Sequence, residues 1–155
     1  AFHDTYFVVA HFHYVMAIAA ILAMFGGFFY WIGKMCGRQY NEGLAKIQFW
    51  IFFIGVNLTF FPQHFSGMAG MPRRIPDYPD AYAGWNYVSS VGAAITMIGT
   101  FLFLYIAWKT ITSGEKAEAN PWGEGATTLE WTVASPAPFH THEQVPDMTG
   151  KAPAE

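Results

Sequence analysis

A chain of 155 residues with 53% hydrophobic residues, 8 Lys and Arg, and 11 Asp and Glu does not have the composition of a soluble domain. The charges are also clustered, because residues 5–33, 47–72 and 81–108 contain no Lys, Arg, Asp or Glu. Each window is longer than the roughly 20 apolar residues that cross a bilayer. We therefore expect an all-α membrane protein with three transmembrane helices in a lipid bilayer. No basic patch suits nucleic acid, which is excluded as a partner.

In chain order, the expected spans are residues 6–33, 47–65 and 85–108. Either Asp4 or Thr5 can cap the start of the first span. The loop at 66–80 is too rich in Gly and Pro to lie in lipid. The third span carries small residues of the kind that let helices approach closely, namely Ser89, Ser90, Gly92, Ala93 and Ala94.

The basic residues near the span ends predict the orientation of the chain. Five of them share one side, which we expect to be the cytoplasmic or matrix side: Lys34, Arg38, Lys46, Lys109 and Lys116. The N-terminus and the 66–80 loop then face the opposite side. Arg73 and Arg74 lie in that loop and break the rule. They are either an ordinary solvated pair or the partners of an anion, because adjacent arginines beside an apolar bundle need counter-charges.

The C-terminal region differs from the rest in charge. Residues 110–155 carry two basic and seven acidic side chains together with five prolines. We expect a transmembrane segment at 1–113 and an extramembrane, mostly irregular tail at 114–155. The single Cys36 excludes an internal disulfide and argues against a thiolate metal site. No signal peptide is evident, and Ala1 is expected to be a processed, trimmed or internally cut terminus.

The first span contains the pair of residues with the clearest chemistry, His11 and His13, on either side of Phe12. A titratable residue in a membrane helix is a functional hypothesis by default, and hydrogen bonding between helices is the alternative. Residues two apart on an α-helix point about 200° apart, so the two imidazoles cannot readily share one ion. If both are ligands, they serve two centres, and imidazole without thiolate suits haem iron or copper. His64 is expected to make an interhelical hydrogen bond.

Several long runs of the sequence carry a family resemblance. They are HDTYFVVAHFHY at 3–14, NLTFFPQHF at 57–65, GMPRR at 70–74, DYPDAY at 77–82, WN at 85–86 and TLEW at 128–131. These runs resemble subunit 1 of the cytochrome c oxidases, in the haem–copper oxidase superfamily, and the first resembles its tenth-helix motif. The resemblance implies that the chain forms part of a twelve-helix bundle.

The resemblance also implies residue roles. His11 matches the proximal ligand of haem a3, His13 matches an axial ligand of haem a, and Phe12 lies between the two haems. Arg73 and Arg74 match residues that contact the propionates of both haems, which are of the haem A type. His3 and Asp4 match ligands of a magnesium ion at the boundary with subunit 2, although Asp4 can also be read as a helix cap.

Only the last three spans of the family are matched, so the copper B ligands and the second haem a ligand lie outside this sequence. The expected partners are the N-terminal part of subunit 1 as a separate chain, subunits 2 and 3, and cytochrome c as electron donor. The expected location is the mitochondrial inner membrane, with the bacterial plasma membrane as the alternative. Ala17 and Gln48 depart from side chains that some relatives carry on a proposed proton path.

Three functions stay open at this point. The first is the C-terminal part of the catalytic subunit of a proton-pumping cytochrome c oxidase, which reduces oxygen to water. The second is a quinol oxidase of the same superfamily. The third is a non-catalytic structural membrane subunit, in which the histidines only join helices.

Overall fold

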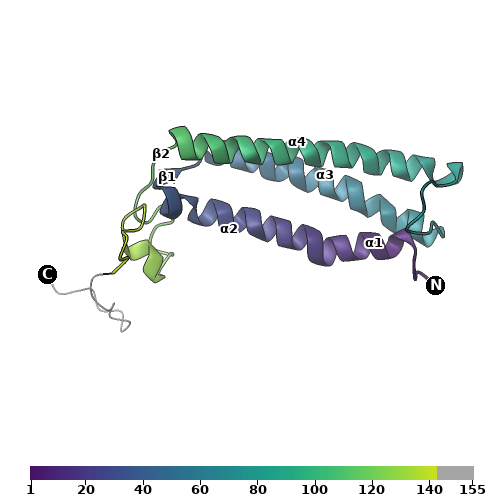
Figure 1. Ribbon diagram of the computed structural model, residues 1–155, viewed down its shortest axis with the longest axis horizontal. Coiled ribbons are helices and arrows are strands. Elements are labelled where there is room, and N and C mark those ends of the chain that lie inside the picture. The colour runs from purple at the N-terminus through teal and green to yellow at the C-terminus, as the bar shows by residue number, and fades with distance from the viewer. Residues whose placement is uncertain (143–155) are drawn as a thin grey trace.

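The computed structural model describes residues 1–142 and contains three helices long and apolar enough to cross a membrane (Figure 1). The all-α prediction is therefore confirmed. The elements are α1 (Tyr6–Phe12), the π-helical segment η1 (His13–Ile18), α2 (Ala19–Cys36), β1 (Arg38–Gln39), α3 (Glu42–Met68), η2 (Asp80–Tyr82), α4 (Ala83–Ser113), β2 (Glu115–Lys116) and η3 (Leu129–Thr132). The first three follow one another without a break and form the first span.

All three helices run past the expected ends, to Tyr6–Cys36, Glu42–Met68 and Asp80–Ser113. The expected spans end near the charged residues, where the apolar sequence stops. The helices continue beyond these points, because a helix keeps its backbone hydrogen bonds in the headgroup region. A helix of 31 residues rises about 47 Å, which exceeds the roughly 30 Å of a hydrocarbon core. The first helix continues through Lys34 and ends where Gly37 adopts the left-handed conformation, with φ of 72°.

Helices α3 and α4 lie side by side along their length (Figure 1). Glycines make this approach possible. A Cβ on Gly55 would lie 2.6 Å from the backbone nitrogen of Thr96, and a Cβ on Gly92 would overlap the backbone of Thr59. The predicted small-residue face is thus right for Gly92 and for the buried Ser89. Ser90, Ala93 and Ala94 are exposed, so they do not contribute to this helix pair, and their role in helix packing stays a prediction.

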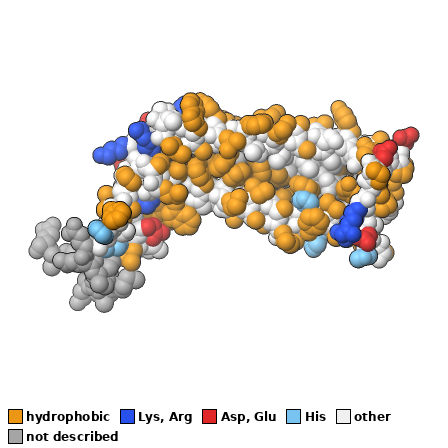
Figure 2. Space-filling model, in the orientation of Figure 1, with side chains coloured by type: hydrophobic (Ala, Val, Ile, Leu, Met, Phe, Trp, Pro, Cys, Tyr) orange, Lys and Arg blue, Asp and Glu red, His pale blue; other side chains and the backbone are white. Residues whose placement is uncertain are grey.

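The first span packs on α3 most closely near its N-terminal end. Gly67 of α3 faces the backbone of Phe7, and a Cβ there would overlap it. Further along, Ile18 joins Phe52 and Val56 in the buried hydrophobic core. Figure 2 shows hydrophobic side chains along the middle of the molecule and charged side chains gathered toward its two ends. This distribution suits a helical bundle that lipid or further helices cover.

Residues 114–142 are mostly irregular apart from the short β2 and η3, and buried Lys34 near the end of α2 holds them. The Lys34 ammonium donates hydrogen bonds to the carbonyls of Ala119 at 2.8 Å and Val133 at 2.6 Å. The indole of Trp131 donates to the Tyr30 hydroxyl at 3.0 Å. In Figure 1 residues 114–142 lie beside the α2 end of the bundle, away from the N-terminus. The expected division into a segment at 1–113 and an extramembrane tail at 114–155 stays a prediction.

Candidate cofactor site

The two histidines of the first span lie at the junction between α1 and η1. His11 sits in the last turn of α1, and its side chain is exposed. Within residues 1–142 it makes no side-chain hydrogen bond. His13 opens η1 and is half-buried, with its ring against Phe60 of α3. These surroundings agree with the expected divergence, since one imidazole faces α3 and the other lies on an open surface.

The six-residue π-helical segment begins at His13 itself and contains neither Gly nor Pro. π-Helical turns inside α-helices are often found at functional sites. This one changes the direction of the side chains that follow His13, because each turn holds more residues than an α-helical turn. The α-helical spacing used for His11 and His13 therefore does not extend to the residues after His13.

The imidazole of His13 has a defined hydrogen-bonding state. Its Nδ1 lies 2.7 Å from the backbone carbonyl oxygen of Val9, one turn earlier. A carbonyl oxygen only accepts, so Nδ1 must carry the proton of this hydrogen bond. In the neutral ring, Nε2 then holds the lone pair. A metal-binding histidine is commonly oriented by such a bond from its second nitrogen, so His13 is prepared to offer Nε2 as a ligand.

No group of three or more His, Cys, Asp or Glu residues able to hold a metal ion occurs among residues 1–142. Within these described residues, the histidine pair is therefore not part of a multi-ligand site. Each of His11 and His13 can offer one nitrogen to a separate centre. A macrocycle that brings its own four ligands, such as a haem, fits single axial imidazoles of this kind.

A second feature lies at the N-terminal end of the same helix, where residues 4–6 pair with residues 71–73. The Tyr6 amide donates to the Met71 carbonyl at 3.0 Å, and the Arg73 amide donates to the Asp4 carbonyl at 2.9 Å. Thr5 lies between them and forms an isolated antiparallel bridge with Pro72. These bonds fix the arginine-bearing loop against the start of α1.

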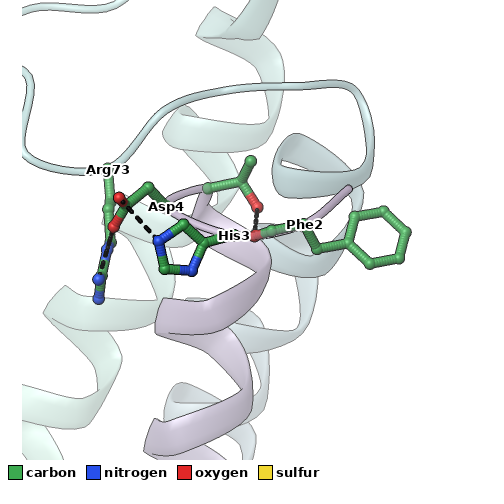
Figure 3. A network of polar contacts seen from close by, with 5 residues as sticks. Phe2, His3, Asp4 and Arg73 are labelled. Carbon is green, nitrogen blue, oxygen red and sulfur yellow. Dashed lines mark hydrogen bonds and ion pairs between the residues drawn. The ribbon is translucent and has the colours of Figure 1, made fainter.

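The side chains of this region form a small polar network (Figure 3). Arg73 donates from Nε at 2.7 Å and from Nη2 at 2.6 Å to one oxygen of Asp4. The other Asp4 oxygen lies 3.2 Å from Nε2 of His3. The hydrogen bond from Arg73 is the main reason that the pKa of Asp4 lies below its ordinary value. Asp4 is therefore an ionised, exposed carboxylate in a fixed position.

The expected cap of the first helix is only half right. Thr5 occupies the N-cap position, but its side chain makes no capping bond to the helix. The Thr5 hydroxyl instead donates to the Phe2 carbonyl at 2.7 Å. Asp4 adopts the left-handed conformation with φ of 56° and points its carboxylate at Arg73 and His3. The capping interpretation of Asp4 is therefore wrong.

The separation of the His3 and Asp4 donor atoms suits a small divalent cation. Adjacent ligands of an octahedral Mg²⁺ site, with bonds of about 2.1 Å, lie about 3.0 Å apart. The 3.2 Å between Nε2 of His3 and the free oxygen of Asp4 is close to that value. The remaining positions would need water or residues from other polypeptides. The two side chains are adjacent and exposed, so both can reach one divalent cation.

The two arginines differ in their surroundings. The Arg73 side chain is 23% exposed and is already paired with Asp4. Arg74 is exposed and adopts the left-handed conformation, with φ of 63°. The sequence argument that Arg73 needs an anionic partner is met within the chain itself. The η-nitrogen that does not contact Asp4 and the whole of Arg74 can still bind another anion.

Sequence reasoning missed the contacts around the histidines. Phe60 stacks on His13, and the Tyr14 hydroxyl donates to the side-chain oxygen of Asn57 at 2.8 Å between the first span and α3. Among residues 1–142, His64 makes no hydrogen bond to another helix, and the interhelical bond expected of it stays a prediction. Its Nδ1 lies 3.2 Å from the carbonyl of Phe61 in its own helix. The aromatic run at 57–65 was visible in the sequence, but nothing in it identified which ring meets His13.

The fold defines a helical membrane protein in which one of three candidate transmembrane helices carries two imidazoles. Residues 1–95 match the family described as cytochrome c and quinol oxidase polypeptide I, and the chain belongs to this family. It is similar to cytochrome c oxidase subunit 1 from Cereibacter sphaeroides, with 56% identity over 146 residues. That match covers 94% of this chain and 26% of the relative, so the chain spans about a quarter of the relative's length.

This membership associates the chain with polypeptide I of the cytochrome c and quinol oxidases. It also supports a multi-pass membrane location. The individual residue roles are separate hypotheses.

Proposed function

We propose that this chain forms the C-terminal, three-helix part of the catalytic subunit of a cytochrome c oxidase, which reduces oxygen to water and pumps protons. The observation that carries the proposal is the pair of diverging imidazoles, His11 and His13, on one transmembrane helix of a chain in this family. One helix that carries two axial ligands places two redox centres at a short, fixed separation. A redox cofactor supplies the electron chemistry, and the protein supplies placement and electrostatics.

His11 is proposed as the axial ligand of haem a3 and His13 as an axial ligand of haem a. The open surroundings of His11 leave its ring nitrogens available to an iron. The Nδ1 bond of His13 to Val9 leaves Nε2 as its ligand atom. Phe12 is 37% exposed between them and is proposed to lie between the two haems. In this arrangement neither histidine moves a proton, because each uses a nitrogen lone pair to hold iron.

Arg73 and Arg74 are proposed to hold the haem propionates. Their loop is tied to the start of α1, and His11 lies about 9 Å further along the helix axis than Thr5. Guanidinium groups bind carboxylates through paired hydrogen bonds. Arg73 would then bridge two carboxylates, the propionate and Asp4, and its bond to Asp4 would fix the orientation of its guanidinium plane.

His3 and Asp4 are proposed as two ligands of a magnesium ion. The proposal is supported by the octahedral spacing of their donor atoms and by the low pKa of Asp4, which keeps the carboxylate ionised. Subunit 2 and water would complete the site.

The remaining machinery is proposed to lie outside these residues. The N-terminal part of subunit 1 would carry the copper B ligands and the second haem a ligand. Subunits 2 and 3 would complete the complex, and cytochrome c would donate electrons. The membrane would be the mitochondrial inner membrane or its counterpart, the bacterial plasma membrane, and the bacterial relative supports the second.

Proton pumping in this chain cannot use a titratable group at position 48. Gln48 is 1% exposed, and its amide donates to the Gly99 carbonyl at 3.4 Å. A glutamine does not change its charge in water. Any proton path past this point must therefore use water or other residues.

Two single variants in the assembled oxidase test the histidine roles. His13→Ala should remove the low-spin haem signals and stop electron entry, while high-spin haem is retained. His11→Ala should retain low-spin haem and abolish oxygen reduction. His64→Ala is the matched control. The His64 ring packs against Phe7 and Tyr14, so this substitution should leave both haem signals intact. Identical losses in the two test variants would contradict two separate centres.

Two alternatives are separated by further measurements. If reduced quinol but not reduced cytochrome c drives oxygen uptake, the complex is a quinol oxidase, which the description of the family also covers. If both histidine variants retain normal haem content, the chain is a structural subunit.

A further inference from the structure

Phe60 of α3 holds a specific relation to the imidazole of His13. The two rings stack with centroids 4.2 Å apart and planes 15° from parallel. Phe60 is itself partly buried, and it packs against the core formed by Ile18, Phe52 and Val56. The ring that faces His13 is therefore anchored by the contact between the first span and α3.

The hydrogen bond to Val9 orients the His13 ring but leaves room for small rotations of its plane. It sets the direction of Nδ1, but the torsion between Cβ and an aromatic ring has broad, shallow minima. A flat neighbour at 4.2 Å removes that freedom, because rotation of the imidazole would drive its edge into the Phe60 ring. Phe12 adds a second ring 4.4 Å away, but it is tilted by 31° and belongs to the same helix. The parallel face thus comes from a different helix.

We infer that Phe60 is a positioning residue that sets the plane of the His13 imidazole and, through it, the electronic state of the iron that His13 binds. This inference rests on the proposed function, in which His13 is an axial ligand. The plane of an imidazole ligand determines which d orbital of a bound iron overlaps with the imidazole π system. That overlap raises the energy of the orbital. Residues behind a metal-binding histidine tune the metal in this way without touching it.

The test uses the assembled oxidase with Phe60→Leu, which removes the flat ring and keeps an apolar side chain. We expect low-spin haem to be retained, while the g values of its ferric electron paramagnetic resonance signal shift and the signal broadens. The midpoint potential of that haem should shift as well. Phe60→Tyr restores a flat ring and should return the g values toward those of the parent. Phe61→Leu is the matched control, because Phe61 is 55% exposed and packs on His64 and Phe65.

The inference is overturned if Phe60→Leu has parental g values and potential at normal haem content. It is also overturned if Phe61→Leu produces the same change. If the complex with Phe60→Leu does not assemble, the same spectra of the Phe60→Met complex test the inference. The His13→Ala variant separates a failure of this inference from a failure of the proposed function. Loss of low-spin haem in His13→Ala with no effect of Phe60→Leu rejects the positioning role alone, whereas normal low-spin haem in His13→Ala rejects the ligand role.

Discussion

Replacing Lys34 by Met should release the tail from the end of α2. Lys34 is 7% exposed, and its ammonium donates to the carbonyls of Ala119 and Val133 at 2.8 and 2.6 Å, with a longer contact of 3.4 Å to Ala134. Hydrogen bonds to a charged group contribute about 1.5–3 kcal/mol each. Methionine keeps the length and apolar stem of the side chain but donates no hydrogen bond. The loss therefore isolates the ammonium contacts.

Two short bonds at the lower end of that range give about 3 kcal/mol. The lower end applies because released carbonyls at this end of the molecule can bind water. A loss of about 3 kcal/mol raises the population of the detached tail on the order of 100-fold, since each 1.4 kcal/mol is a factor of ten.

Hydrogen exchange in the assembled complex measures this population. The amides of Ala117 and Ala137 donate to the carbonyls of Gly37 and Lys34, so both report on tail attachment. Both should lose protection by on the order of 100-fold in Lys34→Met. Lys109→Met is the control, because Lys109 lies over Tyr105 on α4. Unchanged protection of Ala117 and Ala137 would refute the role given to Lys34.

Two further predictions concern helix packing and metal binding. Gly92→Ala should destabilise the α3–α4 pair by about 1–3 kcal/mol, because the added Cβ would lie 2.8 Å from the carbonyl oxygen of Gly55. Thermal unfolding of the complex measures the loss, and Gly84→Ala, where nothing lies within 4 Å of the new Cβ, should have no such effect. Asp4→Asn should weaken binding of Mn²⁺, as a paramagnetic substitute for Mg²⁺, by at least about tenfold. Unchanged Mn²⁺ affinity, measured by electron paramagnetic resonance, would remove Asp4 from the proposed site.

The three spans were predictable because lipid imposes one rule on a long stretch of chain. Charge-free windows and bilayer thickness fix the number of helices without any knowledge of their contacts. The π-helical segment was not predictable in this way, since residues 13–18 contain no Gly or Pro to mark it. The first helix also continues past the expected span at Lys34, whose ammonium reaches backbone carbonyls.

The polar contacts that decide the site join residues far apart in sequence. The pair between Asp4 and Arg73 spans 69 positions, and the bond between Lys34 and Val133 spans 99. Sequence reasoning treated Asp4 as a cap or a metal ligand and Arg73 as a residue that needs an external anion. It did not combine them, although both lie beside charge-free windows on the same predicted side of the membrane. The pair is visible only in the folded structure, which brings the two residues together, and not from their spacing along the sequence.

The helix that carries His11 and His13 is fixed at both of its ends. At the N-terminal end, backbone bonds and the Asp4–Arg73 pair tie it to the loop after α3. At the other end, Lys34 ties it to the tail. A rotation of this helix about its axis would move both imidazoles at once, because both belong to the same short segment. Restraint at the two ends therefore holds both proposed ligands in place relative to the other helices, even though neither restraint touches an imidazole.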